Sequence, residues 1–180
     1  MMGRGITAGD LTVFSDETEE ERADRLGHER RRIAAALRSV DEGRVIPFGD
    51  MAEWAASLGT EQPLPLPRAR RWGDRITVSG VSILADEAAE TLGYIEWWYS
   101  QPGVGAAVTA IRKVRALLAA IDRLATTPEC GLPGETPGTR ELTCQNHRIV
   151  YLIMEREKTA ERVGDAVVFD IFGPAHPDRG

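Results

Sequence analysis

Two apolar runs near the C-terminus decide the fold of this chain: residues 149–153, IVYLI, and residues 167–172, VVFDIF. A nearly continuous apolar run of strand length is typical of a strand in the middle of a covered sheet. A third, shorter strand is predicted from Thr139 to Cys144, and the charged residues 155–165 fit an exposed hairpin loop. The sequence therefore predicts a three-stranded meander with strands near 139–144, 148–154 and 166–172.

Two amphipathic helices are predicted before this meander. One spans roughly residues 83–100, and a longer one runs to about Thr126, where Pro128 stops it. Each has apolar residues at helical spacing on one stripe, and residues 101–103, QPG, break the chain between them. Two helices joined by so tight a break form an antiparallel hairpin. A strand is expected before the hairpin, over residues 74–79.

The N-terminal part begins with a predicted helix. Asp16 with Glu19, and Thr18 with Glu21, are both capping-box patterns, and Gly43 follows the last helical residue. The apolar residues on this helix are few: Leu26, Ile33, Leu37 and Val40. So narrow a stripe suits a helix that lies on a partner better than one in a domain of its own.

A second helix is predicted after Pro47. Asp50 and Glu53 form its predicted capping box, and Gly59 ends it. Its main apolar residues are Trp54 and Leu58. They share one face because they lie four residues apart, which is the arrangement of an interface anchor.

Residues 60–68, TEQPLPLPR, follow this helix. Alternating prolines exclude a helix and favour an extended polyproline geometry. Two roles stay open, a stiff linker and a segment whose Leu64 and Leu66 dock on the C-terminal part; the linker is the preferred interpretation.

Charge and composition limit the function. The 180 residues are 42% hydrophobic, enough for one domain with an appendage or for two small domains. The net charge is −6: residues 1–71 hold 11 basic and 13 acidic residues, and the remainder holds 11 and 15. Neither part has the dense positive surface that nucleic-acid binding needs. Residues 30–32, RRR, lie among acidic residues, which favours a solvated charged face.

A cytoplasmic protein without a cofactor is expected. No apolar run is long enough to span a bilayer, and the N-terminus lacks a secretory apolar region. Cys130 and Cys144, with only three histidines, indicate neither a disulfide framework nor a metal site. Two reduced thiols are the expected state.

The C-terminal part resembles a known superfamily. Residues 128–133, PECGLP, and then residues 138–142, GTREL, follow the helical hairpin. This order resembles the ParE/RelE superfamily of bacterial toxins, over residues 74–176. The resemblance implies an α+β fold made of a strand, an antiparallel helix hairpin and a three-stranded antiparallel meander.

The N-terminal part resembles ParD-like small antitoxins, over residues 20–68. Residues 43–47, GRVIP, lead to Trp54, Gly59-Thr60 and the proline-rich end. The two resemblances imply an antitoxin-like segment at 1–59, a linker at 60–71 and a toxin domain at 72–180. The implied antitoxin–toxin interface consists of Leu26, Ile33, Leu37, Val40, Trp54, Leu58, Leu64 and Leu66.

The resemblance implies a type II toxin–antitoxin module on one chain. The first hypothesis is a ParE-like inhibitor of DNA gyrase, neutralised by its own N-terminal segment. Docking within one chain or swapped between two chains, and a homodimer, are all compatible with the sequence. Many antitoxins also bind DNA, but the only candidate strand for such a part, residues 11–14, is short and not basic, so DNA binding is not predicted.

Two alternatives stay open. The first is a RelE-like, metal-independent endoribonuclease that cuts mRNA on the ribosome; its candidate residues are Arg140, His147, Arg148 and His176. Attack by a 2′-hydroxyl needs a base, an acid and positive charge, which these residues could supply. Each of them also fits a purely structural role, and the acidic charge balance disfavours ribosome binding. The second alternative is a non-toxic remnant that acts as a regulatory scaffold.

Overall fold

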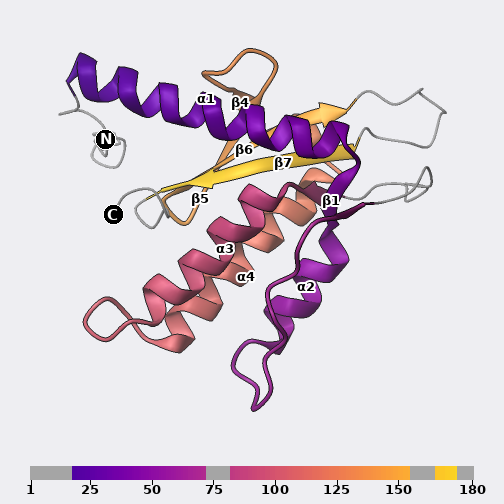
Figure 1. Ribbon diagram of the computed structural model, residues 1–180. Coiled ribbons are helices and arrows are strands. Elements are labelled where there is room, and N and C mark those ends of the chain that lie inside the picture. Colours follow the sequence, from indigo (N-terminus) through magenta and orange to yellow (C-terminus); the bar gives the residue numbers. More distant parts are fainter. Residues whose placement is uncertain (1–17, 72–81, 155–164, 174–180) are drawn as a thin grey trace, which may run out of the picture.

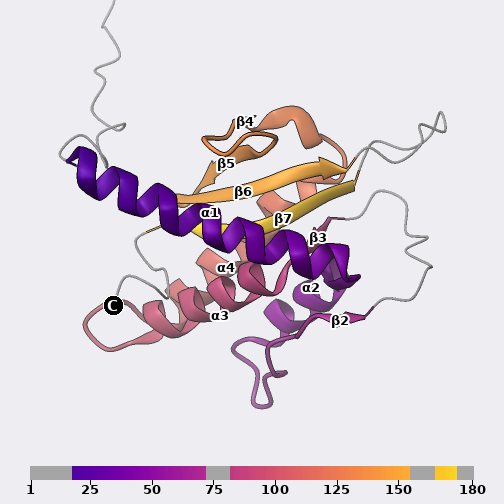
Figure 2. The ribbon, with the colours of Figure 1, turned by 45° about the horizontal axis from the view of Figure 1, so that its top comes forward.

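The computed structural model describes residues 18–71, 82–154 and 165–173. The chain is α+β, with one seven-stranded sheet and helices on both of its faces (Figures 1 and 2). The helices are α1 (Glu19–Asp41), α2 (Phe48–Ser57), α3 (Asp86–Ser100) and α4 (Ala107–Leu124), with a 3-10 turn at Pro128–Cys130. The strands are β1 (Arg44–Pro47), β2 (Arg70–Arg71), β3 (Ile83–Leu84), β4 (Leu132–Pro133), β5 (Arg140–Cys144), β6 (His147–Met154) and β7 (Asp165–Phe172).

The sheet combines strands from both ends of the chain. The strand order is β2-β1-β3-β7-β6-β5-β4. β4 to β7 pair antiparallel, β3 runs parallel to β7, and β1 pairs antiparallel with both β2 and β3. β1 therefore extends the sheet that the C-terminal strands begin.

The two faces of the sheet have separate apolar clusters. α1 lies across one face, where Ile33 and Ala36 pack with Val150, Val167 and Phe169 (Figure 2). α3 and α4 lie side by side against the other face, and α2 packs beside α4 (Figure 1). The alternating side chains of β6 and β7 are thus covered on both sides, which explains why both strands are apolar.

The predicted boundaries of α1 are confirmed. Thr18 Oγ1 accepts a hydrogen bond from the Glu21 amide at 3.2 Å, and Glu21 Oε2 accepts one from the Thr18 amide at 2.8 Å. Together these bonds satisfy two of the amides that have no partner at a helix start. Gly43, just after the helix, has a φ of 73°, a value that glycine adopts without steric cost. The strands predicted near 139–144, 148–154 and 166–172 are also confirmed, each within one residue at either end.

The start of α3 corrects the prediction of a helix from Ile83. Ile83 and Leu84 form β3 instead, and the helix begins at Asp86. Both residues pair with β1 and with β7, and the Ala85 amide donates to the Val168 carbonyl at 2.9 Å. These long-range hydrogen-bond partners make Ile83 and Leu84 a strand, because local helix propensity has only a weak influence on secondary structure. The strand expected over residues 74–79 and the loop expected over 155–164 lie outside the described residues.

The capping box predicted at Asp50 and Glu53 is wrong. α2 begins at Phe48, directly after Pro47, with no side-chain cap. The Phe48 amide donates instead to the Ser82 carbonyl at 3.2 Å, and Asp50 forms an ion pair with Arg70 of β2 at 2.7 Å. Long-range contacts thus replace the local cap.

Within the described part of the chain, no helix combines the length and the apolar character that crossing a membrane requires.

Candidate functional site

α1 meets the sheet through a stripe of side chains that is partly polar. Its buried residues are Glu29, Ile33, Ala36 and Ser39, spaced three or four positions apart. Ile33 and Ala36 pack on the apolar cluster of β6 and β7. Glu29 precedes them on the stripe and is only 3% exposed. A carboxylate so deeply buried requires charged partners.

Arginines from both parts of the chain surround Glu29. Arg25 of α1 donates to it at 3.0 Å, and Arg148 of β6 forms an ion pair with it. Arg148 also donates to Glu141 of β5 at 3.0 Å and lies over the Phe172 ring, 5.6 Å from its centroid. Glu135, before β5, extends the network by pairing with Arg22 and Arg25 of α1 at 3.1 and 3.5 Å. The N-terminal half of α1 is therefore held to the sheet by charge.

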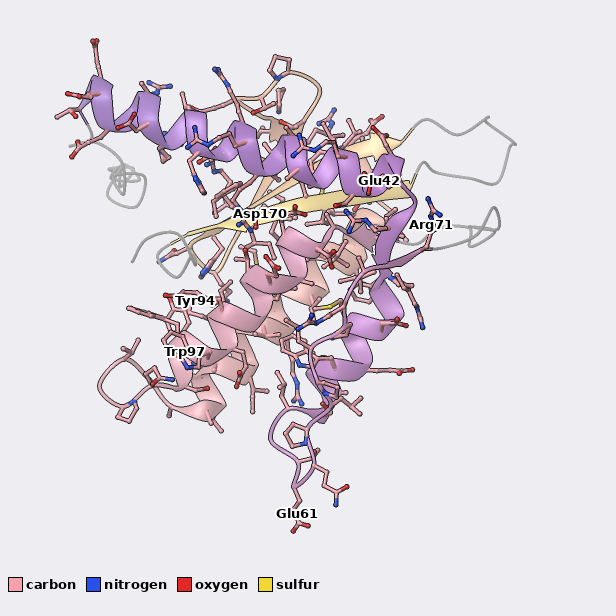
Figure 3. The ribbon with its side chains drawn as sticks, in the orientation of Figure 1. Glu42, Glu61, Arg71, Tyr94, Trp97 and Asp170 are labelled. Atoms are coloured by element: carbon pink, nitrogen blue, oxygen red, sulfur yellow. The ribbon has the colours of Figure 1, made fainter. Side chains whose placement is uncertain are left out.

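Asp170 of β7 is a second buried carboxylate beneath α1, and its side chain is 0% exposed. Arg32 of α1 forms an ion pair with it and also donates to the Glu87 carbonyl at 3.3 Å. Thr91 of α3 donates to Asp170 at 2.7 Å, and the Ile171 amide at 2.8 Å. Figure 3 shows Asp170 between α1 and α3. The site thus joins three elements around one charge.

A β-bulge turns Asp170 toward α1. Val150 pairs with Asp170 and Tyr151 pairs with Val168, so Phe169 is the extra residue on β7. Strict alternation would direct Asp170 and Val168 to the same face. Val168 belongs to the cluster under α3 and α4, whereas Asp170 reaches Arg32 of α1 as well as Thr91 of α3. A bulge re-aims a side chain in this way.

Sequence reasoning missed Glu29, Arg32 and Asp170. Arg32 was interpreted as part of a solvated charged face with Arg30 and Arg31, and only those two are exposed. The position of Asp170 in the sequence offered a signal. Asp170 is the one charged residue in the run VVFDIF, and a charge inside a covered strand needs a partner.

Trp54 and Leu58, the residues predicted to anchor α2, are buried. Trp54 is 4% exposed and Leu58 is 9% exposed, both in the core cluster that contains α3 and α4. Arg115 of α4 donates to the Ala55 carbonyl at 3.2 Å and to the Leu58 carbonyl at 3.5 Å. A guanidinium at this end of α2 satisfies carbonyls that the helix leaves without partners and is favoured by the helix dipole.

The proline-rich segment lies against α3. Leu66 approaches Gly93 so closely that a Cβ on Gly93 would lie 2.7 Å from its side chain. Leu64 is 49% exposed, and its amide donates to Ser57 Oγ at 2.9 Å. An open pocket of about 740 Å³ is lined by Trp54, Leu64 and Leu66, by residues of α3 and by Arg32 of α1. Of the predicted positions on α1, Ile33 is buried, Leu26 and Val40 are half-buried, and Leu37 is exposed.

Arg140 holds a loop within the fold. It donates to the Gly131 carbonyl at 2.6 Å and to the Glu129 carbonyl at 3.3 Å. The Tyr151 hydroxyl donates to the Pro128 carbonyl at 2.6 Å, so both residues fix the turn before β4. Burial raises the pKa of Tyr151.

His147 and Arg148 lie on opposite faces of β6. His147 is fully buried, with Nδ1 2.8 Å from the Gln145 carbonyl and its ring 6.4 Å from the Tyr99 ring. Lys113 also lies over Tyr99, and burial lowers the pKa of this lysine. Arg148 faces α1 instead. The structure therefore does not bring His147, Arg148 and Arg140 together, and His176 lies outside the described residues.

Comparisons with known proteins bear on the N-terminal part. Residues 31–72 match the family model described as Antitoxin RelB3 C-terminal domain. These 42 of the 180 residues include the second half of α1, β1, α2, the proline-rich segment and β2. The chain thus contains a segment similar to this antitoxin domain.

The other comparisons add little. No curated protein matches the chain. One similar solved structure is titled "Chromosomal ParDE TA system from P. aeruginosa"; it is 18% identical, covers 50% of this chain and 90% of its own, and has a TM-score of 0.42. A TM-score this low does not establish a common fold.

Proposed function

We propose that this chain is a toxin–antitoxin module on one polypeptide, in which residues 1–71 neutralise a ParE-like toxin formed by residues 72–180. The observation that carries the proposal is the position of the antitoxin-like segment. Residues 31–72 contribute the C-terminal half of α1 to one face of the sheet, β1 to the sheet itself, and α2 to the helical layer on the other face.

The C-terminal part supports the toxin assignment by its order of elements. β3, the α3–α4 hairpin and the antiparallel strands β5, β6 and β7 follow one another along the chain. This order is the one that the resemblance to ParE/RelE toxins implies. The net charge of −4 in residues 72–180 favours a protein target over RNA. Among protein targets, DNA gyrase is proposed because the resemblance to ParE toxins implies it.

Neutralisation would act by covering surfaces. α1 covers Arg148 and the β6–β7 face, and α2 covers part of α4. Because both segments belong to one chain, the effective concentration of the antitoxin segment is about millimolar or higher. Inhibition is then nearly permanent unless the contacts are weakened.

The ribonuclease alternative stays a prediction. Arg140 is engaged with backbone carbonyls and His147 is buried, and these positions lend it no support. The division into a segment at 1–59, a linker at 60–71 and a domain at 72–180 is likewise proposed, although the two parts share a sheet and an apolar cluster.

Expression in bacteria tests the function. Residues 72–180 alone should arrest growth, and residues 1–71 supplied on a second plasmid should restore it. In a gyrase supercoiling assay, the purified 72–180 segment should inhibit supercoiling, and the purified pair of segments should not. A 72–180 segment that is soluble and folded yet leaves growth and supercoiling unchanged would indicate the non-toxic remnant, and ribosome-dependent mRNA cleavage would indicate the RelE-like alternative.

A further inference from the structure

An open pocket of about 740 Å³ is lined by both parts of the chain. Its size is within the range of about 300–1,000 Å³ that is usual for small-molecule sites. Leu66 lies against Gly93, where a Cβ would be 2.7 Å from the leucine side chain. The absence of a side chain at Gly93 therefore lets the proline-rich segment come close to α3, and the pocket forms where the two meet.

The antitoxin-like segment gives the pocket an apolar lining. Trp54 and Leu58 line it and are themselves buried. Pro63 and Leu64 of the proline-rich segment line it as well, and Leu64 is 49% exposed. The Leu64 amide donates to the Ser57 hydroxyl at 2.9 Å, which holds this residue in place. A ligand with an apolar body covers the exposed part of Leu64, and this burial favours binding.

α3 contributes an aromatic ring and two carboxylates to the same pocket. Tyr94, Glu90 and Glu96 all line it. Glu90 is exposed, and Glu96 accepts a hydrogen bond from the Ser100 hydroxyl at 3.2 Å. The Tyr94 ring belongs to an aromatic group on α3, with its centroid 5.4 Å from that of Trp97 (Figure 3). An aromatic face attracts a cation through its quadrupole, and neighbouring carboxylates add to that attraction.

The charges around the pocket also favour a cation. Among the described residues that line it, Glu90 and Glu96 are acidic and Arg32 is basic. Arg32 forms an ion pair with the buried Asp170, so these two opposite charges offset each other. The two glutamates of α3 then make the surroundings of the pocket negative.

We propose that this pocket binds a small amphipathic organic cation, an alkylammonium ion that carries an apolar body. The apolar body lies against Trp54 and Leu64, and the ammonium group lies near Tyr94 and the carboxylates of α3. Because such a ligand contacts α3 and the proline-rich segment at once, it stabilises their association. This binding activity goes beyond the proposed function and does not depend on the toxin assignment.

Three probes that share one apolar body test the charge requirement. They are 4-phenylbutylamine, which is a cation at pH 7.5, the neutral 4-phenylbutanol and the anionic 4-phenylbutyrate. Each is titrated into the full-length chain by isothermal calorimetry at low salt. The amine should bind with a Kd of about 1 mM or lower and about fivefold or more tightly than the alcohol. The carboxylate should bind most weakly, and high salt should narrow these differences because exposed charges are screened.

Variants of α3 locate the binding site. Glu90→Gln with Glu96→Gln should weaken binding of the amine about five- to tenfold and leave binding of the alcohol unchanged. Glu53→Gln, an exposed carboxylate of α2 outside the lining, is the matched control and should change neither. Tyr94→Leu should also weaken binding of the amine, whereas Tyr94→Phe, which keeps the ring, should retain it.

Amide NMR spectra of the labelled chain show where the amine binds. Shifts should gather at Leu64, Leu66 and the α3 amides near Gly93. The proposal is wrong if the amine does not bind, if the three probes bind alike, if the double glutamine variant binds the amine as well as the unchanged chain does, or if the shifts lie elsewhere. Should Tyr94→Leu fail to fold, the double glutamine variant still decides the point, because Glu90 and Glu96 belong to no buried cluster. Binding is measured directly, so growth arrest by residues 72–180 is a separate question.

Discussion

Three acidic residues of this chain, Glu29, Glu87 and Asp170, are buried or half-buried in the fold. Glu29 on the buried stripe of α1 and Asp170 in β7 are each less than 4% exposed. Glu87, at the first turn of α3, is half-buried, and its Oε2 atom is buried with no hydrogen-bond partner among the described residues. A buried polar atom without a hydrogen bond costs free energy. The burial of Glu87 should therefore be visible as a pH dependence of the stability of the protein.

The prediction at Glu87 is a pH dependence of stability. Burial raises the pKa of Glu87 above its ordinary value of 4.5, while its own backbone amide and Arg32 lower it and Asp170 raises it. The folded state thus binds this proton more readily than the unfolded state. The contribution of Glu87 to stability rises as the pH falls from the raised pKa toward 4.5 and is constant below that.

Replacing Glu87 by Gln should remove this dependence. The variant should be more stable at pH 7 by about 1 kcal/mol, with a smaller difference near pH 4.5. Urea unfolding at several pH values measures it, and Glu90→Gln, an exposed position on the same helix, is the control. A Glu87→Gln variant that is less stable at every pH would show that the carboxylate makes a net favourable contact.

Helix α1 follows local signals, whereas the starts of α2 and α3 and the short strands follow distant contacts. The capping box at Thr18 and the glycine at position 43 delimit α1 correctly. β1 has only four residues and β3 only two, and each is a strand because of its partners in the sheet. The sequence therefore predicts α1 and the apolar strands β6 and β7, whereas β1 and β3 depend on long-range pairing that local patterns do not contain.

The same distinction applies to the candidate site. Trp54 could be selected from sequence because a tryptophan on a short helix, four residues before a leucine, is typical of an interface anchor. Asp170 could not be paired with Arg32, because 138 positions separate them and a bulge decides the face. Arg140 and His147 matched a catalytic pattern by type and order, yet backbone carbonyls and burial determine their surroundings. The sequence gives the type of each residue, but it does not give the direction in which the side chain points in the fold.

At the scale of elements, we predict that Trp54 fixes α2 to the helical layer. The indole is 4% exposed and belongs to the cluster that includes α3 and α4. Replacing it by Ala should lower the free energy of unfolding by about 3–5 kcal/mol, the usual loss for a buried aromatic ring. Urea denaturation followed by circular dichroism measures the change, with exposed Glu53→Ala as the control. A loss below about 1 kcal/mol would mean that α2 is not held through this ring.

Within the described ranges, both parts of the chain contribute strands to the same sheet and side chains to the same apolar clusters. Ile46, Met51 and Trp54 from the N-terminal part lie in one apolar cluster with Leu92 and Ile121 from the hairpin. β1 lies beside β3, and α1 lies across β7. The antitoxin-like segment therefore stabilises the sheet as well as covering it, and its detachment would require breaking main-chain pairing.

The prediction for the whole molecule is therefore a single cooperative unfolding transition of the full-length chain. Segments that share a core and a sheet lose their contacts together, so tryptophan fluorescence and circular dichroism should give coincident curves in urea. Hydrogen exchange tests the same point locally: the amides of β1 should exchange with the same free energy as those of β7. The first turns of α1, exposed from Glu19 to Asp24, should exchange earlier and serve as the internal reference.

Two separate transitions, with β1 exchanging well before β7, would mean that the N-terminal segment detaches as a unit. Inhibition could then be reversible within one chain, and the interlocked arrangement argued here would be wrong.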